Sequence, residues 1–332
     1  PNPHFLQWLP LTHHEDSVLL IRPGQQPRLY YYQPDDYWYL PPSDPESWWA
    51  DHFEVQAVRK PDEWKRLKLG SRTALIGDSP SLVGLAEEGC LNPDRLVNRI
   101  HLERTRKTPS EIACIAESNR LAARAHVAAE RAFRAGCSEY EIHQAYCQAC
   151  GHVDHELPYG NIVALNHHGA VLHYQQHQHS VPDNSYSFLI DAGATQQGYC
   201  SDITRTYAAK EGDFQSMIDA MDVMQQGLCA EMRDGVDYRD LHVDTHRRIA
   251  GILEDFDVIR VSAEEAVSSG LSSVFYPHGL GHFLGIQTHD VAGLISDEDG
   301  TEIPRPEGHP FLRLTRTLEP GNVLTVEPGL YF

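Results

Sequence analysis

The sequence predicts an α+β fold with two domains, in which a smaller α/β domain precedes a larger domain of mixed helices and strands. The chain has 332 residues, which is long enough for two domains. Short strand-like and helical runs alternate in the first hundred residues, and longer helices and apolar strands follow. Their order lacks the regular βαβ alternation of a doubly wound sheet. We place the boundary near Arg104, which gives domains 1–104 and 105–332.

In the first domain, two apolar runs at 17–22 and 28–32 flank a turn rich in glycine and proline, so we expect a hairpin. Further strands are expected at 53–58 and 73–76, and helices are expected to start at Pro61 and Ser79. An aromatic cluster indicates core packing or a subunit interface, with a ligand platform as the alternative. Its members are Tyr30, Tyr31, Tyr32, Tyr37, Trp38, Tyr39, Trp48 and Trp49.

Capping boxes mark the first two helices of the second domain. Thr108-Pro109-Ser110-Glu111 adds proline at the first helical position, and its Ala-rich helix is expected to end near Ala135, before Gly136. Ser138-Glu139-Tyr140-Glu141 opens a second helix, which Gly151 ends. Two more helices are expected at about 213–232 and 237–256. The strands between and after these helices carry acidic and imidazole side chains.

Composition excludes several classes of partner. The formal net charge of −20 argues against nucleic acid, because its binding depends on basic surface. No run of about 18 apolar residues occurs, and no basic segment precedes an apolar one at the start, so we expect neither a membrane span nor a signal peptide. Seven scattered cysteines indicate reduced thiols and a cytoplasmic protein. The pair Cys147 and Cys150 falls on an expected helix, which favours two half-buried thiols over a redox or metal role.

Four side chains of the second domain have the character of metal ligands: Asp191, Asp202, His282 and Glu327. Each lies on or beside an apolar strand, where an ionised group is costly unless a partner or a metal compensates it. Asp191 ends an apolar run and the chain returns past Asp202, so we expect a hairpin with the two aspartates on facing strands. A lone aspartate is more often a turn or cap residue, but the set of four predicts a site for divalent cations.

Histidines gather in two places near these residues. Pro277-His278-Gly279-Leu280-Gly281-His282 places glycines around two imidazoles, and glycine permits close approach of the backbone to a ligand. His289 follows seven residues later. The tract 167–179 also holds several histidines, but it is polar and we expect most of it to be solvated. Only His173 follows an apolar stretch, so we retain it as a site residue.

Together these residues resemble the metallopeptidase family with the pita-bread fold, which includes methionine aminopeptidases, aminopeptidase P, prolidases and creatinase. Within this family the sequence is similar to the bacterial prolidases (Xaa-Pro dipeptidases) and the related organophosphorus acid anhydrolases. The resemblance extends over the whole chain, through segments 8–12, 35–38, 158–166 and 327–332. It implies a pita-bread catalytic domain behind the smaller N-terminal domain.

The resemblance also implies the role of each site residue. Asp191, Asp202, His282 and Glu327 would hold two Mn²⁺ ions per subunit, with Co²⁺ or Zn²⁺ as alternatives. Oxygen-rich ligation with a single imidazole favours Mn²⁺. Glu327 would also carry a proton, and Arg313 would bind the carboxylate of the substrate's proline. Further catalytic or substrate-contacting residues would be His173, His278, His289 and Tyr159.

The resemblance implies hydrolysis of Xaa-Pro dipeptides by a homodimer whose N-terminal domain helps to cover a site, with phosphotriester hydrolysis as a plausible side activity. Two alternatives remain, an aminopeptidase P-type exopeptidase and a non-catalytic pita-bread module that binds proteins. The family uses a fifth ligand, a second bridging glutamate well beyond the position of Glu327, whereas this chain ends at Phe332. We therefore expect a C-terminal segment to be absent and the chain as given to hold metal poorly, since the loss of support for one ligand typically costs about tenfold or more in affinity.

Overall fold

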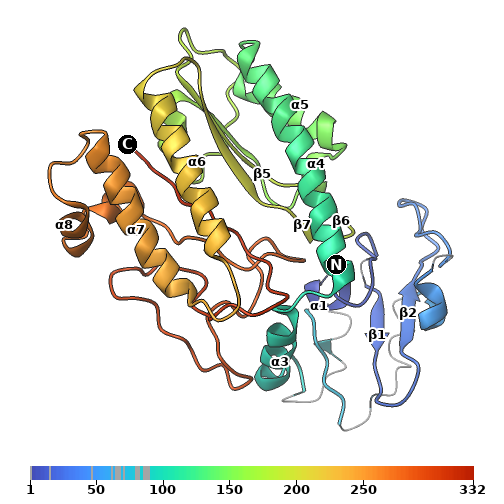
Figure 1. The fold of residues 1–332 in the computed structure, drawn as a ribbon. Helices are drawn as coiled ribbons and strands as arrows, with labels where there is room; N and C mark the ends of the chain where they lie inside the picture. Colours follow the sequence, from blue (N-terminus) through green and yellow to red (C-terminus); the bar gives the residue numbers. More distant parts are fainter. Residues whose placement is uncertain are drawn as a thin grey trace. The chain divides into compact units, whose positions relative to one another are not determined.

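The computed structural model describes residues 2–14, 16–45, 48–60, 63, 69, 72–78, 83–84 and 90–332. The chain forms two compact units, Pro1–Ile100 and His101–Phe332 (Figure 1). The helix starts expected at Pro61 and Ser79 lie outside the described residues. None of the described helices has the length and apolar character needed to cross a bilayer.

A three-stranded sheet organises the first unit. Strand β1 (Val18–Leu20) pairs antiparallel with β2 (Arg28–Tyr32), which confirms the expected hairpin, and β2 pairs parallel with β3 (Glu54–Val58). The expected strand at 73–76 makes only one isolated bridge, between Leu75 and Leu91. The short helix α1 (Pro3–Leu6) and the 3-10 helix η1 (Ala50–His52) complete the described elements.

The aromatic cluster of this unit divides into two parts. Tyr31 and Trp49 are buried in the core with Leu9, Leu11 and Leu29, so the expectation of core packing is confirmed for these two rings. Four other rings are exposed, and packing within the unit does not explain them: Tyr37, Trp38, Tyr39 and Trp48.

The four helices predicted for the second domain begin and end close to their expected bounds, whereas three further described helices, one before them and two after, were not predicted. Helix α3 (Asp94–Arg104) is followed by α4 (Pro109–Arg134) and α5 (Glu139–Cys150), and both expected capping boxes are present. Gly151 adopts the left-handed conformation that ends α5. The remaining helices are α6 (Asp213–Glu231), α7 (Tyr238–Asp255), α8 (Ala263–Ser268) and α9 (Ser272–Phe275), with 3-10 turns η3 (Asp154–Glu156) and η4 (Asn166–Ala170).

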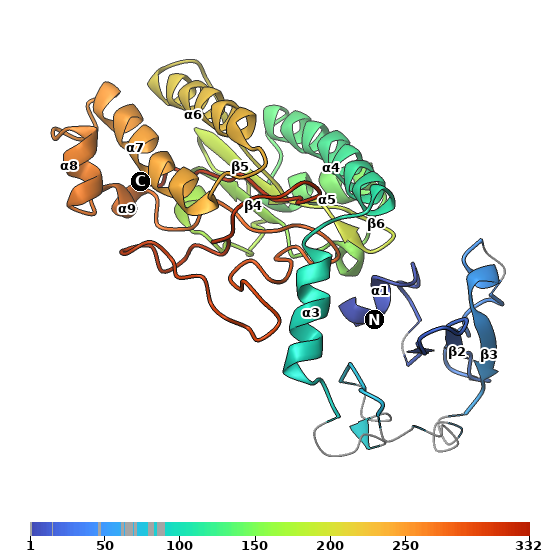
Figure 2. The ribbon, with the colours of Figure 1, turned by 60° about the horizontal axis from the view of Figure 1, so that its bottom comes forward.

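An antiparallel sheet lies against α4 and α5 (Figure 2). Its strand order is β4 (Ile162–Leu165), β5 (Ser187–Ala192) and β8 (Ile203–Ala208). A small hairpin of β6 (Thr195–Gln196) and β7 (Tyr199–Cys200) is inserted between β5 and β8. Phe188, Ile190 and Ala192 of β5 are buried in the helix-covered core, so the alternation of a strand places Asp191 on the opposite face.

A second core joins α6 and α7 to the irregular C-terminal part of the chain. Buried Leu228 and Ile249 of these helices belong to the same apolar cluster as Leu280, Phe283 and Leu314. The C-terminal segment is thus held by packing even though it forms no long strand.

The buried carboxylate of Glu139, the first residue of α5, organises the polar loop that follows β4. It accepts hydrogen bonds from Leu165 N, Tyr174 Oη, Gln178 N and His168 Nδ1, at 2.8, 2.6, 2.9 and 2.7 Å. Burial alone would raise the pKa of Glu139, but these hydrogen bonds together outweigh it and lower the pKa below its ordinary value.

We predict that Glu139→Gln lowers the free energy of unfolding by about 3 kcal/mol at pH 7, because buried donors lose a charged acceptor. Urea denaturation measures the change, with the exposed Glu211→Gln as the matched control. A lowered carboxyl pKa stabilises the fold above the unfolded value of 4.5 and loses that contribution as the pH falls. The difference between parent and variant should therefore shrink below about pH 4.5; an equal stability of the two proteins at pH 7 would contradict this role.

Candidate metal centre

The four ligand-type side chains converge in the second unit. His282 Nε2 lies 3.2 Å from Asp202 Oδ2 and 3.1 Å from Glu327 Oε1. The hydroxyl of Tyr159 donates to Asp191 Oδ1 at 2.7 Å and to Asp202 Oδ1 at 2.9 Å, so it joins the two aspartates. Residues separated by up to 168 positions in the sequence thus form one continuous polar cluster.

The two aspartates do not lie on facing strands, as the sequence analysis expected. The cross-strand partner of Asp191 is Thr204, and Asp202 lies just before β8, at the exit of the inserted β6–β7 hairpin. A tight crossing brings Asp202 back toward Asp191, since a Cβ atom at Gly193 would lie 2.1 Å from Ser201 O. The prediction of proximity holds, but the inserted hairpin, rather than strand register, produces it.

His282 and Glu327 are held side by side by paired backbone. Thr325 N donates to His282 O at 2.9 Å, and Glu327 N donates to Leu280 O at 2.8 Å. A Cβ atom at Gly281 would lie 2.3 Å from Thr325 O, so only glycine permits this approach. Glycine at this position therefore serves the packing of two chain segments, whereas the sequence analysis related it to the approach of a ligand.

Thr325 is a residue of the site that the sequence analysis missed. Its Oγ1 accepts from His282 N at 3.0 Å and donates to Glu327 Oε1 at 2.8 Å, so it fixes the backbone of His282 and the side chain of Glu327. The available signal was its position two residues before Glu327, which places both on one face of an extended segment.

The electrostatics of this cluster fit a cation. Burial and the neighbouring Asp202 raise the pKa of Asp191 to about 7, which shows that its negative charge lacks compensation. Burial alone would lower the pKa of His282, but its hydrogen bonds to Asp202 and Glu327 raise it to about 10. Three carboxylates and one imidazole are suitable donors for divalent ions.

Three further predicted residues lie next to this cluster. The ring of His289 packs edge-on against that of His282, with centroids 4.3 Å apart. Burial lowers the pKa of His289, and the charges of His282 and Arg313 lower it further, so Arg313 lies close by. Arg313 is exposed and, within the described part of the chain, forms no ion pair. His278 hydrogen-bonds Tyr331 Oη through Nε2 at 3.0 Å.

Most residues of the histidine tract 167–179 are exposed, as expected. His173 is exposed and makes no hydrogen bond or ring contact with the other site residues that the structure describes. In contrast, His168 bonds the buried Glu139 and stacks on Tyr174, and His177 stacks on His143. The expectation that most of the tract is solvated is therefore confirmed, and His168 and His177 are exceptions because Glu139 and His143 provide their partners.

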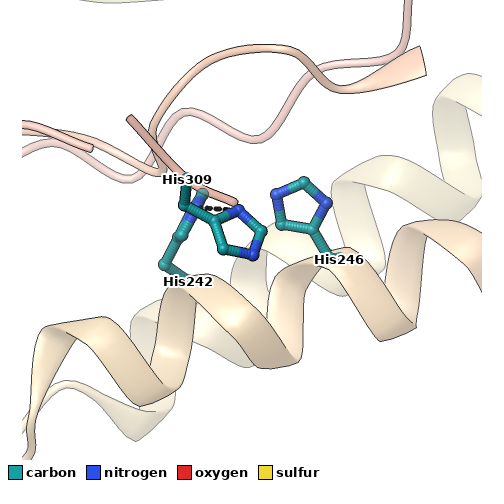
Figure 3. Close-up of side chains that lie close together, drawn as sticks. All are labelled: His242, His246 and His309. Atoms are coloured by element: carbon teal, nitrogen blue, oxygen red, sulfur yellow. Dashed lines mark hydrogen bonds between the residues drawn. The ribbon is translucent and has the colours of Figure 1, made fainter. Parts of the chain in front are cut away.

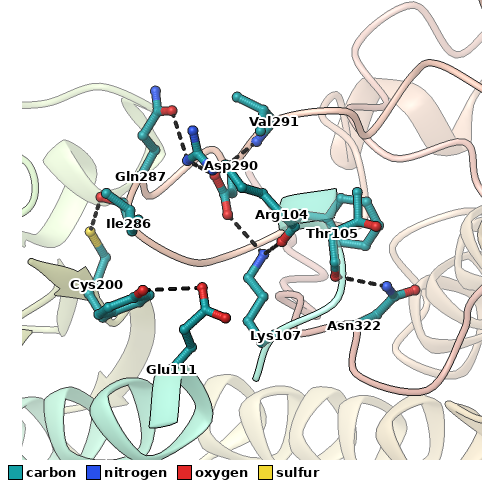
Figure 4. A network of polar contacts seen from close by, with 12 residues as sticks. Arg104, Thr105, Lys107, Glu111, Cys200, Ile286, Gln287, Asp290, Val291 and Asn322 are labelled. Carbon is teal, nitrogen blue, oxygen red and sulfur yellow. Dashed lines mark hydrogen bonds and ion pairs between the residues drawn. The ribbon is translucent and has the colours of Figure 1, made fainter. Parts of the chain in front are cut away.

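A buried ion cluster fixes the loop that carries His289 (Figure 4). The carboxylate of the next residue, Asp290, pairs with Arg104 and, at 2.8 Å, with Lys107 Nζ. Arg104 also donates to Gln287 Oε1 at 3.1 Å. All three charged side chains are almost fully buried, so removal of one partner would leave an uncompensated charge.

The Cys147 and Cys150 pair lies on α5, away from these contacts. All seven cysteines are unpaired, and both thiols of this motif are buried. Cys150 Sγ donates to Cys147 O, whereas Cys147 Sγ lies 3.7 Å from His143 Nε2. Burial raises the pKa of the Cys147 thiol to about 12, which makes it unreactive at neutral pH.

Comparison with known proteins identifies the family. Residues 113–332 match metallopeptidase family M24, and residues 1–102 match the N-terminal domain of Xaa-Pro dipeptidases. The chain belongs to metallopeptidase family M24. This membership confirms the predicted pita-bread catalytic domain with a smaller domain before it, and confirms the prediction of a metallopeptidase. Divalent metal ions are implied for the family as a whole.

Curated relatives resemble the chain over its whole length. Proteins named Xaa-Pro dipeptidase from Stenotrophomonas maltophilia (strain K279a) and Xanthomonas oryzae pv. oryzae (strain MAFF 311018) are each 50% identical over 334 residues. The alignments cover 100% of this chain and 75% of each relative, so the chain spans about three quarters of their length. The predicted likeness to prolidases is confirmed.

Solved structures show the same fold. The chain is similar to zinc-substituted Escherichia coli aminopeptidase P in complex with product, with a TM-score of 0.74 and 24% identity over 95% of this chain and 75% of that one. Proline aminopeptidase P II from Yersinia pestis gives a TM-score of 0.71 at 24% identity, with the same coverage. At this level of identity the likeness concerns the fold alone.

We predict that Mn²⁺ raises the melting temperature of the full-length protein and that Asp202→Asn removes most of this effect, because Asp202 lies between His282 and the Tyr159–Asp191 pair. A ligand at about 100 times its Kd stabilises a fold by about 2.7 kcal/mol. Thermal denaturation with and without Mn²⁺ measures the shift in melting temperature. The control is Asp183→Asn, which replaces an exposed aspartate. Equal Mn²⁺ responses of Asp202→Asn and Asp183→Asn would contradict the placement of the ion.

Proposed function

We propose that the full-length protein hydrolyses the Xaa-Pro bond of dipeptides and releases proline. The observation that carries the proposal is the convergence of Asp191, Asp202, His282 and Glu327 beside the exposed cation of Arg313. The 50% identity to proteins named Xaa-Pro dipeptidase supports the choice of substrate.

We assign Asp191, Asp202, His282 and Glu327 as the ligands of two divalent ions, with Mn²⁺ as the expected metal and Co²⁺ or Zn²⁺ as alternatives. When bound, such ions polarise a carbonyl group and lower the pKa of a bound water from about 15.7 toward about 7. Tyr159 supports the aspartates, since its hydroxyl donates to both. Burial and the two aspartates raise the pKa of Tyr159 well above its ordinary value, so it remains a donor at neutral pH.

We assign Glu327 to the proton and His289 to the scissile carbonyl group. Glu327 has one oxygen fixed by Thr325 and a side chain that is 37% exposed, so its second oxygen can carry a proton to the leaving proline nitrogen. His289, whose pKa is lowered by burial and by His282, is neutral at pH 7 and can donate a hydrogen bond to the carbonyl oxygen. His278 and His173 are assigned contacts with the substrate.

The proposed substrate class rests on the chemistry of the scissile bond and of the substrate's terminal carboxylate. An Xaa-Pro bond has no N–H group, so an enzyme that cleaves it must recognise other features of the substrate. The guanidinium of Arg313 is a planar, permanently charged fork that fits a terminal carboxylate. This contact would restrict hydrolysis to peptides that end at the proline.

We also propose an oligomeric state, a cellular location and a side activity, each from a single observation. The protein is a homodimer in this proposal, supported by the exposed apolar surface of Tyr37, Trp38, Tyr39 and Leu40. Seven unpaired cysteines support a cytoplasmic location. Phosphotriester hydrolysis is a side activity of the same site, since an attacked phosphorus centre resembles the tetrahedral intermediate of amide hydrolysis.

The direct test compares Mn²⁺-dependent hydrolysis of Ala-Pro and Ala-Pro-Ala, with Ala-Ala as the control for general peptidase activity. The proposal requires release of proline from Ala-Pro and little turnover of the tripeptide. Preferred cleavage of Ala-Pro-Ala would favour an aminopeptidase P-type enzyme, which the similar fold also accommodates. Failure to bind any divalent metal would favour a non-catalytic module.

We predict that Arg313→Ala lowers kcat/KM for Ala-Pro. The activation free energy derived from kcat/KM should rise by about 2–5 kcal/mol, as for the loss of one partner of a desolvated charge pair. Arg313→Lys should recover only part of the loss, since lysine keeps the charge without the planar fork. The exposed Arg247→Ala is the control for loss of a surface cation. Steady-state kinetics measure all three variants, and parental kcat/KM in Arg313→Ala would remove Arg313 from the substrate site.

A further inference from the structure

Three histidine rings meet at a place distinct from the four ligand-type residues of the candidate metal centre (Figure 3). His242 and His246 lie one turn apart on α7 and are buried, and the half-buried His309 approaches them from the loop beyond residue 300. One nitrogen from each ring lies within 4.8 Å of the other two, and His242 Nε2 is 3.0 Å from His309 Nδ1.

Within the part of the chain that the structure describes, histidine–carboxylate pairs form at His143, His168 and His282, and no carboxylate pairs with these three rings. Burial lowers the pKa of His242 to about 2 and that of His246 to about 4, and it also lowers the pKa of His309. The three rings are therefore neutral at pH 7, and each has a nitrogen lone pair. His242 Nδ1 is buried without a hydrogen-bond partner among the described residues. In this structure the His242–His309 and His246–Ser272 hydrogen bonds hold the rings, and a cation bound by the three rings would take the place of the first of these bonds.

The local geometry fits metal coordination. Residues four apart on a helix project on the same face, which is why His242 and His246 can share an ion. Ser272 Oγ engages His246 Nδ1 at 3.0 Å, which fixes the ring and leaves Nε2 available. Neutral imidazoles are ligands for Zn²⁺, Co²⁺, Ni²⁺ and Cu²⁺, whereas Mn²⁺ prefers oxygen donors.

We propose that His242, His246 and His309 form a separate transition-metal site whose ion is Zn²⁺. Three imidazoles supply the ligands, and a fourth position remains for water. The ion would attach the loop that carries His309 to α7, and Arg313 lies only four residues further along this loop.

The site would also touch the candidate metal centre through packing. His246 and Tyr276 have ring centroids 4.6 Å apart, and Tyr276 and His278 have centroids 5.0 Å apart. An ion at the three histidines would thus stabilise the surroundings of His278 without binding the substrate. The inference does not depend on the proposed dipeptidase activity, since metal content and stability test it.

The decisive experiment measures zinc in tag-free protein after exposure to Zn²⁺ and dialysis, in a background with Asp191→Asn and Asp202→Asn. Elemental analysis should find one Zn²⁺ per chain in this background and none after the addition of His309→Ala. The control is His155→Ala, which removes an exposed histidine and should retain the ion. The parent protein should likewise bind one more Zn²⁺ per chain than the parent protein that carries His309→Ala.

A second measurement needs no replaced histidine. Co²⁺ added to the Asp191→Asn, Asp202→Asn protein should give the visible absorption of a four-coordinate nitrogen-ligated ion, and equimolar Zn²⁺ should abolish it. Zn²⁺ should also raise the melting temperature of this protein by several degrees, and His309→Ala should cancel the shift. Absence of both bound Zn²⁺ and the Co²⁺ absorption would overturn the proposal, as would equal zinc content in His309→Ala and His155→Ala.

Discussion

The candidate metal centre depends on the backbone pairing of two C-terminal segments, 280–283 and 324–327. Two hydrogen bonds hold the segments in register, and Gly281 permits their approach. This pairing places His282 and Glu327 on either side of Thr325, which hydrogen-bonds both. Tyr238 of α7 donates to Thr325 O, so a buried helix supports the pairing from the core side. Ligands supplied by irregular chain can be positioned in this way because the surrounding core is packed.

The second half of the centre comes from the antiparallel sheet, and the charges there would favour a bound cation. Asp191 points away from the helix-covered face, and Tyr159 is the only hydrogen-bond donor to its carboxylate among the described residues. Burial and the neighbouring Asp202 raise the pKa of Asp191, and the hydrogen bonds to Asp202 and Glu327 raise the pKa of His282. A divalent ion would relieve the repulsion between the two aspartates. Membership of metallopeptidase family M24 agrees with the donor set, and the chain's own geometry shows how the donors meet.

The sequence predicts local structure well, because it depends on short-range patterns. The capping boxes at Thr108 and Ser138 require only residues three positions apart, and both form. Long-range partners were not predictable: Thr325 and the Asp290 ion cluster became evident only when distant segments met. The spacing of His242 and His246 is readable as a helical pair, but His309 stands 63 residues after His246 with no motif linking them. The choice of His173 rests on local apolarity, which does not reveal that its neighbours His168 and His177 contact Glu139 and His143.

The central claim is that four side chains from distant parts of the chain surround paired cations. Crystals grown with Mn²⁺ and measured at the manganese absorption edge test it most directly, because anomalous scattering locates the ions independently of any assumed site. The account predicts two anomalous peaks about 3.5–4 Å apart, each within bonding distance of oxygens from Asp191, Asp202 or Glu327. Peaks confined to other parts of the protein, or no peak in fully folded crystals, would contradict it.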